Sequence, residues 1–157
     1  MAVSLWTAGS VSGPPGYGGW SWVSAQDSVA SGMAGGERRT TLRRMQLVGL
    51  IEAVKAAPVG VKLVIHCDEV AVAQIALTRL AGKPVEVEEA DLWTQIDALV
   101  APRREALEFR RMAIPGATHT FVAAWADQAR DKTKATGPFR TAIPKPNLSK
   151  FPGLPTA

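Results

Sequence analysis

The sequence predicts an α/β protein with one mixed five-stranded sheet flanked by helices. Three segments near the N-terminus, residues 2–8, 20–24 and 28–33, have strand character and are joined by turn-rich stretches, which is typical of an antiparallel meander. Two later strand candidates, residues 61–67 and 107–114, are separated by helical segments, which is typical of parallel crossovers onto the same sheet. The order of elements therefore predicts three antiparallel strands followed by parallel ones.

Helical spacing of apolar residues begins at Leu42, and Pro58 and Gly60 end this first helix. Thr40 or Thr41 can cap it, because a threonine hydroxyl accepts a hydrogen bond from an amide of the first turn. Three further helices are expected over residues 70–80, 91–100 and 120–132. These helices would cover the sheet.

Length and composition restrict the class of protein. The chain has 157 residues, 46% of them hydrophobic and 20% charged, which fits one ordinary folded domain and excludes a disordered, collagen-like or coiled-coil protein. A single cysteine, Cys67, excludes a disulfide scaffold and favours a reducing compartment. No apolar run approaches the ~20 residues of a membrane span, and no signal-peptide pattern is present. We expect a monomeric cytoplasmic protein without membrane contact.

The positive charge is concentrated at the C-terminal end. Residues 1–130 hold 13 Lys and Arg against 13 Asp and Glu, whereas residues 131–157 hold five basic residues against Asp131 alone, so the net +4 comes from that end. Prolines at 138, 144, 146, 152 and 155 disfavour helix there. The sequence predicts a folded domain over 1–132 and a basic, proline-rich tail over 133–157. Such a tail can bind nucleic acid or a protein partner.

Several short motifs, taken in order, resemble type 1 ribonuclease H. They are Thr7-Ala8-Gly9-Ser10 where that family has T-D-G-S, Thr40 to Leu47 where it has T-T-N-N-R-M-E-L, Cys67-Asp68-Glu69 for T-D-S, Asp91-Leu92-Trp93 for D-L-W, and Ala126 to Arg130 for A-D-x-L-A-R. The resemblance covers residues 2–132 and implies the RNase H-like fold.

The resemblance also implies a chemistry. The family cleaves the RNA strand of an RNA–DNA hybrid, with two magnesium ions stabilising the attacking and leaving oxygens. Four carboxylates hold those ions, and their positions fall here at Ala8, Gln46, Asp68 and Asp127. Two of the four carboxylates are therefore missing, and the formal charge of the site falls from −4 to −2. We expect at most one Mg²⁺ or Mn²⁺, held by Asp68 and Asp127.

Other residues could compensate for the missing acids or assist the reaction. Glu37 and Glu69 are the acidic residues considered as replacement ligands. The family places a mobile histidine in the loop before the last helix, and His119 matches it if that loop is shortened. The candidate catalytic residues are thus Asp68, Asp127 and His119.

Substrate binding in the family uses a phosphate pocket and a pair of asparagines. Arg39 and Thr41 match two residues of the pocket, whereas Pro14 stands at the third, and Arg43 falls on one asparagine position. With Arg44 these residues make a basic start to the first helix, suited to phosphate. The basic protrusion of many bacterial members is replaced by the short acidic segment 82–90.

Three functions remain open from the sequence. The first is an RNase H-like module that binds RNA–DNA hybrid or duplex and cleaves weakly or not at all. The second is an active, metal-dependent ribonuclease H rescued by other ligands. The third is a scaffold for protein interaction. Fold alone does not decide between them.

Overall fold

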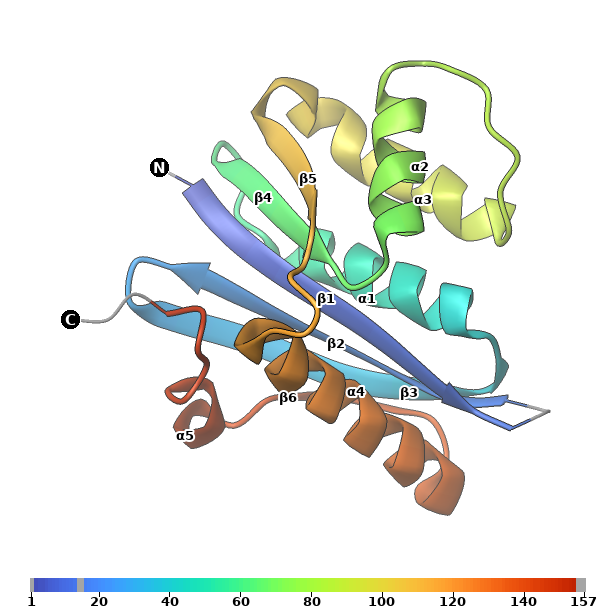
Figure 1. Ribbon diagram of the computed structural model, residues 1–157, viewed down its shortest axis with the longest axis vertical. Helices are drawn as coiled ribbons and strands as arrows, with labels where there is room; N and C mark the ends of the chain where they lie inside the picture. The colour runs from blue at the N-terminus through green and yellow to red at the C-terminus, as the bar shows by residue number, and fades with distance from the viewer. Residues whose placement is uncertain (1, 14–15, 155–157) are drawn as a thin grey trace.

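In the computed structural model, which describes residues 2–13 and 16–154, one mixed sheet carries helices on both faces (Figure 1). The strand order is β5-β4-β1-β2-β3-β6. β1 (Ala2–Ser12), β2 (Gly16–Gln26) and β3 (Val29–Thr40) form the antiparallel meander, and β4 (Lys62–Cys67) and β5 (Leu107–Arg111) add to β1 in parallel. The predicted mixed α/β class is confirmed, as are the three antiparallel strands followed by parallel ones.

The number of strands was predicted wrongly. A sixth strand, β6 (Phe139–Ala142), pairs antiparallel with β3 at the edge of the sheet. It comes from the segment that the prolines and positive charge had marked as a tail. The strand itself contains no proline, and Pro138 and Pro144 lie on either side of it.

The helices follow the predicted positions closely. They are α1 (Leu42–Ala56), α2 (Val70–Leu80), α3 (Ala90–Val100), α4 (Ala117–Thr136) and the short α5 (Lys145–Leu148), with a 3₁₀ turn at Ala101–Ala106. Thr41 caps α1, since its hydroxyl accepts from the Arg44 amide at 3.1 Å. α4 begins three residues earlier than predicted and ends four later.

The sheet separates two apolar clusters because side chains alternate between its faces. In β1, Val3 and Leu5 belong to the cluster shared with α1 and α3. Trp6 and Ala8 belong to the other cluster, shared with α4 and the C-terminal segment. The end of β1 is thus held between helices on both faces, which fixes the position of the residues that follow.

The C-terminal segment covers the α4 face of the sheet. Ile143, Leu148 and Phe151 are buried there, and the Phe151 ring packs edge-on against Trp6 with centroids 4.8 Å apart. In Figure 1, β6 and α5 lie beside α4 and the meander. Within the described residues, no helix is long and apolar enough to cross a membrane.

Candidate functional site

The C-terminal end of β4 lies beside the middle of β1 and brings the first group of site residues together. Thr7 pairs with Cys67 in the parallel register, so the next residues, Ala8 and Asp68, follow at the same edge of the sheet. The Gly9 amide donates to Asp68 Oδ2 at 3.1 Å. The side chain of Gln46, from α1, also hydrogen bonds the Asp68 carboxylate. Gln46 and Asp68 therefore meet here, one residue along from the strand position of Ala8.

Gln46 is fixed in place by the close approach of β1 and α1. A Cβ at position 9 would lie 2.7 Å from the backbone nitrogen of Gln46, so only glycine allows this approach. Gln46 itself is buried. Its side-chain amide can donate a hydrogen bond to Asp68. An ionised glutamate at this position has no N–H group and could not do so.

Asp68 is a partly buried carboxylate surrounded by N–H donors. Burial raises the pKa of its carboxyl from the usual 3.8 to about 6, and the charge of neighbouring Glu69 acts in the same direction. Hydrogen bonds from Gly9, from the backbone of Asp68 itself and from Gln46 lower that pKa and limit the rise. These N–H donors stabilise the ionised form of the Asp68 carboxyl, a role that bound cations would have at the corresponding family position.

Asp127 lies on α4 and is bound to the same strand end. The Ser10 hydroxyl donates to Asp127 Oδ1 at 2.6 Å. Arg130, one turn further along α4, donates to the Ser10 hydroxyl at 2.9 Å and lies 3.4 Å from the Asp127 oxygen. The two retained carboxylates thus contact adjacent residues of β1, Gly9 and Ser10.

Ala8 is a buried apolar residue at the position where the family has its first carboxylate. Its side chain is 1% exposed and belongs to the buried cluster that contains Val122 and Ala126. Within the described part of the chain, no group of three or more His, Cys, Asp or Glu side chains could hold a metal ion. Of the four family positions, Asp68 and Asp127 carry carboxylates, whereas Ala8 and Gln46 do not.

The two acids considered as replacement ligands are engaged elsewhere. Glu69 caps α2, where its carboxylate accepts from the Ala71 amide at 3.3 Å. Glu37 lies 3.6 Å from Arg44 at the start of α1.

His119 is placed in the first turn of α4, not in the preceding loop. It stands eight residues before Asp127 on the same helix, which corresponds to about 12 Å along the axis. Its catalytic role stays a prediction.

The predicted nucleic-acid-binding residues fall into two groups at the start of α1. Thr41 and Arg44 already have partners: both donate to the Glu89 carboxylate, and Arg44 also pairs with Asp91 and Glu37. Arg39 is exposed with a positive φ of 54°, and the Nε of Arg43 makes no hydrogen bond to any described residue. Pro14 lies outside the described residues.

Sequence reasoning missed three participants. Ser10 and Arg130 stood inside the recognised motifs, and the three-residue spacing of Asp127 and Arg130 on a helix is the signal that could have paired them. Glu89 had no such signal, because its contacts with Thr41 and Arg44 span 48 and 45 residues.

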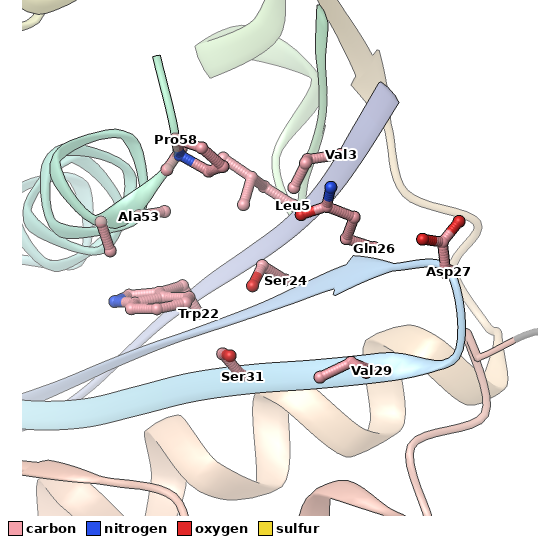
Figure 2. A pocket seen from close by; sticks show the side chains of 12 residues that line it. Val3, Leu5, Trp22, Ser24, Gln26, Asp27, Val29, Ser31, Ala53 and Pro58 are labelled. Atoms are coloured by element: carbon pink, nitrogen blue, oxygen red, sulfur yellow. The ribbon is translucent and has the colours of Figure 1, made fainter. Parts of the chain in front are cut away.

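A separate hollow of about 440 Å³ lies at the opposite end of the sheet, where β1 begins and α1 ends (Figure 2). Trp22, Leu5 and Pro58 form part of its wall, with Ser24 and Ser31 on its polar side. It contains none of the residues that the sequence singled out for chemistry.

Curated relatives identify the family. No protein-family model matches the chain. Ribonuclease H of Bordetella pertussis is 33% identical over 109 residues, which are 62% of this chain and 69% of the relative. Ribonuclease H of Albidiferax ferrireducens is 31% identical over 119 residues, 69% of this chain and 79% of the relative. The chain belongs to the ribonuclease H family.

Solved structures agree on the fold. The N-terminal RNase H domain of a Mycobacterium tuberculosis protein, solved as a fusion with maltose-binding protein, matches with a TM-score of 0.71 at 20% identity and covers 87% of this chain and 98% of that chain. LC11-RNase H1 in complex with an RNA/DNA hybrid matches with a TM-score of 0.67 at 16% identity, covering 84% and 99%. The RNase H-like fold expected from the motifs is confirmed.

Proposed function

We propose that this protein binds RNA–DNA hybrid or duplex nucleic acid and hydrolyses it weakly or not at all. Membership of the ribonuclease H family supports the ligand class, as do two structural neighbours, one solved with an RNA/DNA hybrid and one with double-stranded DNA. The observation that carries the loss of hydrolysis is the pairing of Asp68 with the neutral Gln46 side chain, together with the buried methyl group at position 8.

Electrostatics gives the reason for weak hydrolysis. Two divalent cations bring a charge of +4, and the family positions supply −2 in place of −4. Each missing carboxylate removes a few kcal/mol of attraction at an effective dielectric constant of about 20. A loss of about 3 kcal/mol corresponds to roughly a hundredfold weaker ion binding. In addition, Arg130 already places a positive charge beside Asp127.

A single ion remains compatible with the proposal. Asp68 and Asp127 would hold one Mg²⁺ or Mn²⁺, which prefer carboxylate oxygens and retain several waters. Such an ion supplies charge neutralisation for a bound phosphate. The symmetric clamp on attacking and leaving oxygens needs a second ion.

The binding surface is proposed to centre on Arg39 and Arg43. Arg38 extends it toward the end of α4, since its guanidinium lies 3.8 Å from the position of a Cβ built on Gly137. Lys134 is exposed on the last turn of that helix. Guanidinium groups suit this role because they bind phosphate with two parallel hydrogen bonds.

A cleavage assay tests the loss of hydrolysis. A labelled RNA–DNA hybrid is incubated with Mg²⁺ or Mn²⁺ and either the unmodified chain, Gln46→Glu, or Ala8→Asp combined with Gln46→Glu. We expect little or no cleavage by the unmodified chain and a gain with the double variant. Circular dichroism checks that the variants fold, and Gln46→Glu serves where an aspartate at position 8 is not tolerated. Rapid cleavage by the unmodified chain would overturn the proposal.

A binding assay tests the surface. Arg39→Ala combined with Arg43→Ala should weaken hybrid binding at low salt. The slope of the logarithm of the binding constant against the logarithm of the salt concentration should become shallower by about 0.9 for each phosphate that the protein no longer neutralises. Lys83→Ala combined with Arg104→Ala is the matched control, because both side chains are exposed and lie outside the proposed surface. Equal affinities for the two double variants would argue against this surface.

A further inference from the structure

Glu89 joins two of the expected binding residues at the start of α1. It is the last residue of the segment 81–89 between α2 and α3, and it adopts a positive φ of 60° directly before α3. Its Oε1 accepts from the Thr41 hydroxyl at 3.2 Å, and its Oε2 accepts from the Arg44 guanidinium at 3.1 Å. Both oxygens of one carboxylate are therefore bound to groups at the start of α1.

The geometry resembles that of a bound anion. A hydroxyl at a helix start and a guanidinium one turn later are donors that suit phosphate. A carboxylate and a phosphate both present oxygens that such donors bind. Arg44 is further occupied by Asp91 at 3.4 Å and Glu37 at 3.6 Å. The positive charge of Arg44 is thus already neutralised by three carboxylates of the chain itself.

We propose that Glu89 is an internal competitor for nucleic-acid phosphate: its carboxylate occupies the Thr41–Arg44 donors, and a phosphate group binds there only when Glu89 is displaced. This inference rests on the proposed nucleic-acid-binding function and refines it. Arg39 and Arg43, which Glu89 does not contact in any described interaction, then make the first contacts with the ligand.

Two physical effects give Glu89 this role. Its negative charge repels an approaching phosphate, and its hydrogen bonds must be exchanged for those of the ligand. Both partners are partly exposed, with side-chain exposures of 31% for Arg44 and 22% for Glu89, so the contact can open without disturbing the core.

The test compares two variants with the same change of charge. Glu89→Gln removes the competing charge, whereas Glu88→Gln removes the charge of an adjacent, exposed residue with no described side-chain partner. Affinity for a short labelled RNA–DNA hybrid is measured by fluorescence anisotropy at low salt. We expect Glu89→Gln to bind about tenfold more tightly than Glu88→Gln, because Arg44 then loses one of its three carboxylate partners and can form a charge-assisted hydrogen bond with phosphate. Thermal melting checks that both variants fold.

A double variant locates the increase in affinity. Arg44→Ala in the Glu89→Gln background should remove most of it, because the freed guanidinium is then absent. If the unmodified chain binds the hybrid and Glu89→Gln matches Glu88→Gln, the competitor role is wrong while the proposed function stands. If neither the unmodified chain nor any variant binds the hybrid, the proposed function is wrong and the inference falls with it.

Discussion

Gln46 and Ala8 change the chemistry of the site without changing its architecture. Gln46 has the size of a glutamate and keeps its place against β1, but it offers an N–H group to Asp68 instead of a second negative charge. Ala8 places a methyl group in the buried cluster on the α4 face of the sheet. Under the proposed function, the fold persists while the attraction for cations decreases.

The raised pKa of Asp68 predicts a pH-dependent cost in stability. Between pH 3.8 and about 6 the folded state keeps a proton that the unfolded state has lost, so the free energy of unfolding falls as pH rises through this range. Asp68→Asn removes this fall. We expect it to stabilise the protein at pH 7 by up to about 3 kcal/mol and to have little effect near pH 4.

Urea unfolding at the two pH values measures this effect. Glu105→Gln is the control, since its side chain is exposed and has no described partner. Destabilisation by Asp68→Asn at pH 7 would contradict the raised pKa and would indicate that the ionised carboxylate is favourable in the fold.

Ser10 links Asp127 and Arg130, which predicts a measurable loss on its removal. The hydroxyl donates to a carboxylate and accepts from a guanidinium, and the residue is 8% exposed. Ser10→Ala should lower the free energy of unfolding by about 1–3 kcal/mol, because a charge-assisted pair of hydrogen bonds is lost. Chemical denaturation measures the loss, and Ser12→Ala, nearer the end of the same strand, is the control. No difference between the two variants would mean that water replaces the hydroxyl without cost.

At the level of elements, the C-terminal segment is part of the domain's packing. Pro144 precedes α5 and Pro146 stands in its first turn, positions where proline is tolerated because the amide has no helical partner. Ile143, Leu148 and Phe151 then supply apolar side chains to the sheet. The prolines and positive charge indicated an extended tail, and the apolar residues spaced between them were the signal for packing.

Removing one of these apolar side chains should destabilise the whole domain. Phe151→Ala empties the contact with Trp6 and Phe121 and should cost about 3–5 kcal/mol. Lys150→Ala, at an exposed neighbouring position, is the control. Thermal and urea unfolding measure the difference. Equal stabilities would mean that the segment contributes little to the folded state.

Local patterns predicted most elements because their signals lie within the elements themselves. Thr41, Pro58 and Gly60 mark the two ends of α1, and the β-branched run before Cys67 marks β4. The α4 boundary was missed because Gly116 offers no side-chain cap, so the helix start carries no sequence signal. β6 was missed because its strand character depends on β3, to which it pairs more than 100 residues away in sequence.

On the scale of the whole molecule, opposite ends of the sheet have different properties. The carboxylate site and the arginines lie toward the end of β1 and the start of α1, whereas the separate hollow lies where β1 begins and α1 ends. The contacts near the site come from distant segments, with Ser10 on β1, Glu89 directly before α3 and Arg130 on α4. A single sequence predicts each family position but not these partners, because only the fold brings them together.

The central claim is that the site has too little negative charge to hold two divalent ions. Calorimetric titration with Mn²⁺ tests it directly, on the unmodified chain and on Ala8→Asp combined with Gln46→Glu. The unmodified chain should bind at most one ion, about a hundredfold more weakly than the double variant. Two ions bound by the unmodified chain with the affinity of the double variant would contradict the claim.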